Sequence, residues 1–185
     1  ALILGYLCIN LEYQQYPTIG AFRRTPVAVQ MTLEEFQQRD HAPTLDGREV
    51  GALVTVPAAP MRDAYAYVPP AYWQGATLPV MVLLSGSPGS PMGWFTDGQA
   101  DDTADAYQAE HGGASPIVVG VDGTGSTTGN PACVDGPQLQ MQTYLAEDIP
   151  ALLKDTFRVN PDQHSWTIGG LSYGGTCSLQ VVANA

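Results

Sequence analysis

The stretch TIGGLSYGGTCS, residues 167–178, contains the pattern G-x-S-x-G as Gly170-Leu171-Ser172-Tyr173-Gly174. This pattern is typical of a serine nucleophile on a sharp turn between a buried strand and a helix. The β-branched and aromatic residues of 164–168 predict a short buried strand, and residues 176–183 predict the first turns of a helix. The order strand, turn, helix is the one that the motif requires. The alternative is a plain glycine-rich loop in an α/β sheet.

The residue types around Ser172 fit the chemistry of an exposed nucleophile. A turn this tight strains the backbone, and it needs small residues two positions before and two positions after the serine, which here are Gly170 and Gly174. The amide of Tyr173, at the start of the following helix, is then placed to stabilise an oxyanion.

The pattern upstream of the turn predicts a layered α/β fold. Two extended runs come first, and they are followed by apolar strands that alternate with helical segments. Such alternation indicates a largely parallel sheet with helices on both faces. The predicted strands are 48–57, 62–73, 78–86 and 115–123, and the predicted helices are 97–110 and 139–157, the second kinked or restarted at Pro150.

Three stretches resemble the esterase branch of the α/β-hydrolase superfamily, which includes esterase D, feruloyl esterases and actinobacterial mycolyltransferases of the antigen 85 type. They are LPVMVLLSGSPGSPMGW (78–94), PIVVGVDGTGS (116–126) and the segment from Tyr144 to Gly175. The resemblance covers about residues 46–185. It implies an α/β-hydrolase fold, mostly parallel, with antiparallel leading strands.

The resemblance also implies roles for individual residues. Ser172 matches the nucleophile, and the backbone N–H groups of Ser87 and Tyr173 match the two donors of the oxyanion hole. The stretch SGSPGSP around Ser87 has two other interpretations, a flexible loop or a phosphate cradle that lacks the lysine of a P-loop.

The implied function is that of a serine-dependent carboxylic ester hydrolase or acyltransferase that works through an acyl-enzyme on Ser172 and needs no cofactor. Its substrate would be a small-molecule, lipid or glycolipid ester. The alternative is a non-catalytic hydrolase-like module with a binding or membrane-associated structural role. The sequence does not distinguish hydrolysis from acyl transfer.

The histidines depart from the family pattern. In α/β-hydrolases the acid and the histidine of the triad follow the serine along the chain, but the 13 residues after Ser172 include neither. His41, His111 and His164 all lie upstream; His111 is expected at a helix C-terminus and His164 at the far end of a strand. We therefore expect the chain to be the N-terminal part of a hydrolase domain, truncated after the nucleophile helix, and to be inactive alone.

The N-terminal residues suggest attachment to a membrane. Residues 1–9 form an apolar run, expected to be the end of a membrane helix or else a buried first element. Residues 10–45 are expected to be a connector with one short helix that begins at a capping box at Thr32, and Arg23-Arg24 to contact lipid head groups or solvent. Residues 9–22 resemble the segment after the membrane helices of anchored actinobacterial members. We expect a membrane-associated, extracytoplasmic protein, or else a secreted one.

Composition narrows the possible partners. The chain has 185 residues, 44% of them hydrophobic, which is enough for one substantial core. Its net charge of −11 argues against nucleic acid as a partner.

The sequence gives two alternatives for Cys133 and Cys177. Cys133 and Cys177 are expected either to form a disulfide that fastens residues 123–137 in an extracytoplasmic domain or to be two buried thiols in a cytosolic enzyme, whereas Cys8 belongs to the apolar run.

No Cys/His spacing indicates zinc. The four aspartates between residues 97 and 105 favour an acidic helix N-terminus over a calcium loop, so we expect no metal site.

Overall fold

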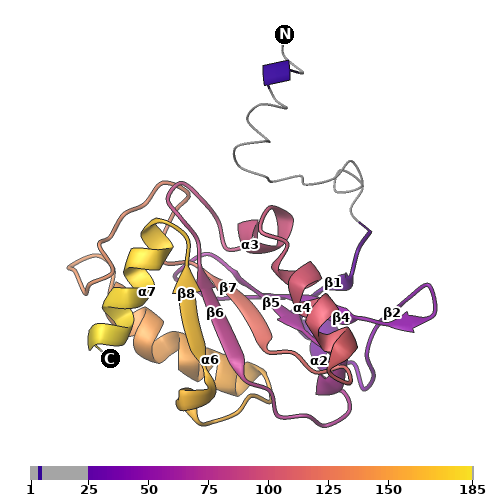
Figure 1. Ribbon diagram of the computed structural model, residues 1–185. Coiled ribbons are helices and arrows are strands. Elements are labelled where there is room, and N and C mark those ends of the chain that lie inside the picture. Colours follow the sequence, from indigo (N-terminus) through magenta and orange to yellow (C-terminus); the bar gives the residue numbers. More distant parts are fainter. Residues whose placement is uncertain (1–3, 6–24, 185) are drawn as a thin grey trace.

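A computed structural model describes residues 4–5 and 25–184 of the chain. Its centre is a six-stranded sheet in the order β1-β4-β5-β7-β6-β8, with β8 at one edge (Figure 1). The elements in chain order are β1 Ala28–Thr32, α2 Leu33–Gln37, β2 Thr44–Leu45, β3 Arg48–Glu49, β4 Gly51–Val56, β5 Ala64–Val68, the 3₁₀ turn η2 Pro70–Tyr72, β6 Val80–Leu84, α3 Gly93–Thr96, α4 Ala100–Glu110, β7 Ile117–Val121, α5 Met141–Thr143, the π-helical turn η3 Tyr144–Asp148, α6 Ile149–Thr156, the 3₁₀ turn η4 Gln163–Ser165, β8 Thr167–Gly170 and α7 Tyr173–Asn184.

The strand directions confirm the predicted fold class. Strands β7, β6 and β8 are parallel neighbours, whereas β5 runs antiparallel to both β4 and β7. Consecutive parallel strands are joined through helices, which cover both faces of the sheet. The sheet is therefore mostly parallel with antiparallel leading strands, as an α/β-hydrolase fold requires.

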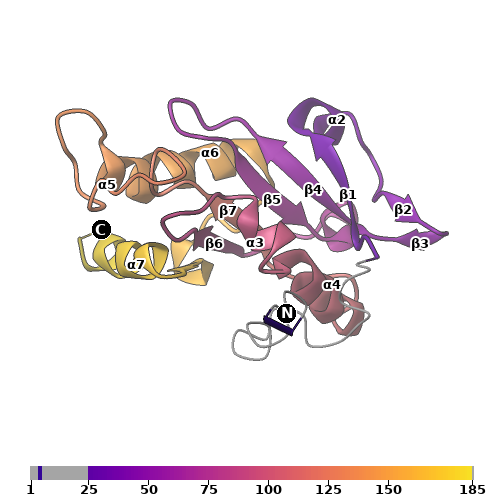
Figure 2. The ribbon, with the colours of Figure 1, turned by 90° about the horizontal axis from the view of Figure 1, so that it is seen from above.

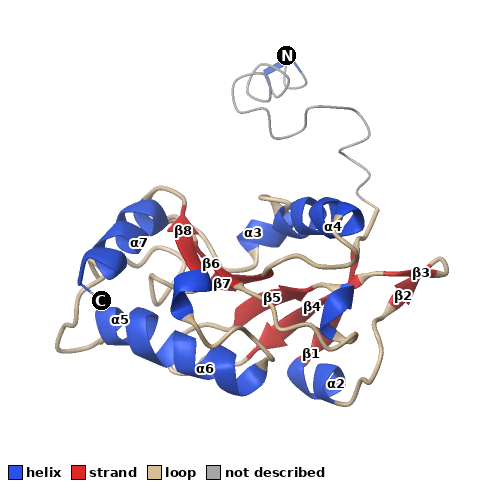
Figure 3. Cartoon of the chain, turned by 60° about the horizontal axis from the view of Figure 1, so that its bottom comes forward, coloured by secondary structure: helices blue, strands red, loops and turns tan. Residues whose placement is uncertain are grey.

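Alternate residues of the central strands face opposite helical layers. Val82 and Leu84 belong to the larger core, which also holds side chains of α2, α6 and α7. Met81 and Leu83 pack against the smaller core, to which α3 and α4 contribute Phe95 and Ala104. Figures 2 and 3 show α4 on one side of the sheet and α2 and α6 on the other. A period of two along a strand gives this division.

The sheet begins upstream of the boundary that the sequence pattern suggests at residue 46. Residues 28–32, part of the expected connector, form β1 and pair in parallel with β4. Met31 is buried in the larger core. Directly after it, α2 begins at the predicted capping box: the Thr32 side chain accepts from the Glu35 amide, and the Glu35 carboxylate accepts from the Thr32 amide.

Several predicted boundaries were wrong by three residues or more. The strand expected over 62–73 ends at Val68, because residues 70–72 form the turn η2. The helix expected over 97–110 begins at Ala100, because Gln99 adopts a left-handed conformation (φ +51°) after the short helix α3. The strand expected over 164–168 begins at Thr167 and is half-exposed, because residues 163–165 form the turn η4, capped by the Asp162 side chain. The expected break in the 139–157 helix is present as the π-helical turn η3 before Pro150.

Within residues 4–5 and 25–184, no helix is both long enough and apolar enough to cross a bilayer. Apart from residues 4 and 5, the apolar run 1–9, including Cys8, lies outside the described residues. Residues 10–24, including Arg23-Arg24, lie outside them as well.

Candidate active site

Ser172 lies at the tip of the turn between β8 and α7. Its backbone has φ +54°, in the left-handed region that non-glycine residues seldom adopt, and its side chain is exposed. Within the described part of the chain, no hydrogen bond engages its hydroxyl. Strain of this kind costs on the order of 1–3 kcal/mol and persists only where the surroundings impose it. The turn therefore presents a free hydroxyl at the carboxyl edge of the parallel strands.

Two glycines allow the chain to turn so closely. A Cβ on Gly174 would lie 2.1 Å from the carbonyl oxygen of Leu84, the last residue of β6. A Cβ on Gly170 would lie 2.4 Å from the carbonyl carbon of Gly174. The first turn of α7 thus packs directly on β6 and β8, with no room for side chains.

The loop after β6, which carries Ser87, lies against the nucleophile turn. A Cβ on Gly86 would lie 3.3 Å from the Leu171 carbonyl oxygen and 3.5 Å from the Ser172 Cβ. No hydrogen bond between described residues uses the N–H of Ser87 or that of Tyr173. The Tyr173 amide directly follows the serine in the chain, the Ser87 amide directly follows Gly86, and neither has a hydrogen-bond partner among the described residues.

A cavity of about 790 Å³ opens beside the turn. Its size is within the usual range for a small-molecule site. The buried Ser85 hydroxyl and the buried Trp94 indole N–H have no hydrogen-bond partner among the described residues, and both residues line the cavity. The other lining residues include Gly86, Pro88, Asp97 and Leu171. The cavity therefore lies against both the Ser87 loop and the turn that carries Ser172.

Tyr173 and a disulfide attach the nucleophile helix to the loop after β7. The Tyr173 hydroxyl donates to the Gly123 carbonyl (3.1 Å) and lies 3.0 Å from the Cys133 sulfur. Burial raises the pKa of this hydroxyl. Cys133 and Cys177 form a disulfide with a Cα–Cα distance of 5.5 Å, within the range that a disulfide demands. The structure thus has the bridge rather than two free thiols.

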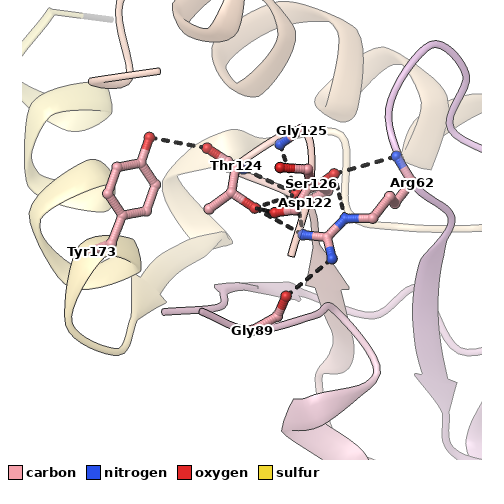
Figure 4. Close-up of polar contacts among 8 residues, drawn as sticks. Arg62, Gly89, Asp122, Thr124, Gly125, Ser126 and Tyr173 are labelled. Atoms are coloured by element: carbon pink, nitrogen blue, oxygen red, sulfur yellow. Dashed lines mark hydrogen bonds and ion pairs between the residues drawn. The ribbon is translucent and has the colours of Figure 1, made fainter. Parts of the chain in front are cut away.

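A buried ion pair beneath the site was missed by the sequence analysis. Asp122 follows β7 directly and is fully buried, and Arg62 forms a bidentate pair with its carboxylate at 2.8 and 2.9 Å (Figure 4). An aspartate at the carboxyl end of a buried strand is a signal that could have pointed to Asp122. The sequence gives no comparable signal for Arg62, which lies 60 residues away in a loop.

The histidines lie away from this edge of the sheet. His111 caps the C-terminus of α4, with its Nδ1 2.7 Å from the Tyr107 carbonyl oxygen and its ring stacked on that of Tyr107. Because α4 returns the chain to the start of β7, His111 is at the amino edge of the parallel strands. His164, in the turn just before β8, is at that edge too. His41 pairs with Asp40 at the surface.

No group of three or more potential metal ligands occurs among the described residues.

Comparison with known proteins identifies the class. Residues 61–185 match the Esterase family model, described as "Putative esterase". The chain belongs to this family. A protein of Corynebacterium glutamicum described as uncharacterized is 55% identical over 196 residues, covering 100% of this chain and 46% of the relative.

Solved structures agree on the fold. A ferulic acid esterase of Anaeromyces mucronatus superposes with a TM-score of 0.55 at 17% identity, covering 77% of this chain and 59% of that one. An S-formylglutathione hydrolase of Agrobacterium tumefaciens gives 0.50 at 22% identity, covering 65% and 47%. The chain thus spans about half the length of the relatives that it matches, and at these identities the likeness shows the α/β-hydrolase fold alone.

Proposed function

We propose that this chain is the nucleophile-bearing part of a serine-dependent carboxylic ester hydrolase or acyltransferase. The observation that carries the proposal is the exposed Ser172, held at φ +54° with its hydroxyl free. Membership of the esterase family supports the reaction class.

In the proposed reaction the Ser172 oxygen attacks the ester carbonyl, and the carbonyl oxygen becomes an oxyanion. The N–H groups of Ser87 and Tyr173 stabilise that charge, and removal of one such donor typically costs about 2.7–4 kcal/mol of barrier. The serine proton passes to a general base and then to the leaving alcohol. Water or a second alcohol then releases the acyl group from Ser172.

The cavity beside Ser172 is the proposed substrate site. Among the described residues, its lining includes one carboxylate, Asp97, and no basic side chain. This disfavours anionic groups next to the scissile bond and fits an uncharged small-molecule, lipid or glycolipid ester.

We also propose an extracytoplasmic location at the cell envelope. The disulfide between Cys133 and Cys177 supports it, because such bonds persist in oxidising compartments. Thiol trapping of the protein in intact cells tests this: both cysteines should resist alkylation until a reductant is added.

Labelling with a fluorophosphonate tests the nucleophile. The protein expressed from its complete coding sequence should be labelled stoichiometrically at Ser172, as mapped by mass spectrometry. Ser172→Ala should abolish labelling, whereas Ser90→Ala, which alters a serine of the cavity lining, should preserve it. Ser87→Ala should also preserve labelling, because the proposed donor is the backbone N–H. Absence of labelling in the unaltered protein would favour the non-catalytic binding module.

A further inference from the structure

Arg62 joins two loops at the carboxyl edge of the sheet. From the connection between β4 and β5, its guanidinium donates to both carboxylate oxygens of Asp122, to the Thr124 hydroxyl (2.8 Å) and to the Gly89 carbonyl (3.0 Å). Figure 4 shows Asp122 and Thr124 on one side of the guanidinium and Gly89 on the other. A planar group with five donors suits such divergent contacts.

Asp122 is a rigid anchor for Arg62. Besides Arg62, it accepts from the amides of Thr124 (2.9 Å) and Gly125 (3.1 Å). Burial opposes ionisation of this carboxyl, but the hydrogen bonds from Arg62 and Thr124 outweigh it and lower its pKa. The hydrogen bonds from Arg62 to Asp122 raise the pKa of the guanidinium in turn. Both groups are charged at neutral pH.

The Gly89 peptide connects this anchor to the proposed oxyanion hole. Gly89 lies two residues after Ser87; its carbonyl accepts from Arg62, and its N–H donates to the Thr127 carbonyl (2.9 Å). Residues 122–127 therefore hold the Ser87 loop from both directions. Residues 122–127 also hold Tyr173, whose backbone N–H is the other proposed donor, because the Tyr173 hydroxyl donates to the Gly123 carbonyl.

We propose that Arg62 is a positioning residue for ester cleavage: it fixes the Ser87 loop relative to Ser172 and so sets the gap between the two oxyanion donors. The inference rests on the proposed function. Arg62 is not among the residues that line the cavity; its side chain contacts the lining residue Gly89, is anchored to Asp122, and acts through these two residues.

Steady-state kinetics of Arg62 variants test this in the protein expressed from its complete coding sequence. Arg62→Gln should lower kcat for a p-nitrophenyl ester by about 10²–10³-fold, the effect of losing one oxyanion donor, and leave KM within about threefold. Arg62→Lys keeps a positive charge beside Asp122 but cannot span all four acceptors with one nitrogen. It should fold and show a smaller loss of kcat.

The matched control is Arg48→Gln, which breaks the other arginine–aspartate pair of the described chain, Arg48 with Asp105 at 3.2 Å. Its kcat should stay within about twofold of the unaltered protein. An alkyl boronic acid, which forms a tetrahedral adduct on serine, adds a readout that folding does not mimic. Its affinity should fall in Arg62→Gln in parallel with kcat.

Each outcome decides the proposal. Native kcat and boronate affinity in folded Arg62→Gln would overturn it, as would a loss confined to KM. If Arg62→Gln does not fold, Arg62→Lys decides by the same two readouts; failure of both variants to fold would overturn the proposal in favour of a purely structural role. An unaltered protein that neither labels nor turns over esters would instead refute the proposed function.

Discussion

Two arginine–aspartate pairs in this molecule have the same chemistry and very different surroundings. In the pair beside the candidate active site, Arg62 is 26% exposed and Asp122 fully buried, whereas in the pair between the β2–β3 hairpin and α4, Arg48 is 52% exposed and its contacts to Asp105 are 3.2–3.3 Å long. Asp105 itself is only 11% exposed, so the two pairs differ mainly in the exposure of the arginine and in contact length. An exposed partner weakens an ion pair, whereas removal of one partner from a buried pair is costly.

Further long-range contacts surround the pair beside the candidate site. Contacts near the candidate site join distant parts of the chain: the disulfide spans 44 residues, and the Tyr173 hydroxyl reaches back 50 residues. Long-range side-chain contacts occur elsewhere too, because Phe36 of α2 packs against the rings of Tyr72 and Phe157. The geometry of the site therefore depends on contacts between segments that are far apart in the sequence.

The largest expected effect tests whether a base lies near Ser172. The 185-residue chain alone should not turn over a p-nitrophenyl ester, because its histidines at positions 111 and 164 are at the opposite edge of the sheet. Loss of triad function costs up to about 10⁶-fold in kcat. Release of p-nitrophenol by the chain, assayed beside its Ser172→Ala variant, measures this activity. Hydrolysis that disappears in the alanine variant would contradict this assignment, and His111→Ala would then identify the base.

The disulfide should contribute the next largest effect. For a loop of 44 residues the chain-entropy model gives about 4 kcal/mol of stabilisation. The double variant Cys133→Ala/Cys177→Ala should lose about that much free energy of unfolding in urea. A reductant should destabilise the unaltered chain to a similar degree and leave the variant unchanged. Equal sensitivity to the reductant in both would show that the bridge is not the cause.

Asp122→Asn should cost about 3 kcal/mol at pH 7, because it leaves the Arg62 charge without its partner. The pKa of Asp122 is lowered in the folded state, so its stabilisation is present above the unfolded pKa of about 3.9 and is lost as pH falls below it. Urea unfolding at several pH values measures the difference in free energy of unfolding between the unaltered protein and Asp122→Asn. It should be constant from about pH 6 to 8 and shrink below about pH 4.

The matched variant is Asp105→Asn, expected to cost about 1 kcal/mol or less at pH 7 because its arginine is half-exposed. Equal costs at the two aspartates would contradict the comparison between the two pairs.

The parts of the fold that sequence patterns predicted are the local ones. Apolar strands, the capping box at Thr32 and the break before Pro150 each depend on neighbours within a few residues. The G-x-S-x-G pattern placed Ser172 on a turn for the same reason. Strand β1 was missed because its short half-buried run has meaning only when paired with β4. Arg62 was missed because its partner is 60 residues away.

The last comparison concerns two adjacent glycines of β8. Consecutive residues of a strand face opposite sides of the sheet. A Cβ on Gly170 would collide with the backbone of Gly174 at 2.4 Å and of Leu84 at 2.7 Å, whereas one on Gly169 would meet nothing closer than 4.0 Å.

Because backbone cannot yield as a flexible side chain can, Gly170→Ala should cost about 2 kcal/mol of folding free energy, typical of overpacking, and should slow fluorophosphonate labelling by displacing α7. Gly169→Ala should be neutral or slightly stabilising, because alanine restricts the unfolded chain more than glycine does. Urea unfolding and labelling rates of the two variants decide the matter, and equal losses would mean that the tight turn does not hold Ser172 in place.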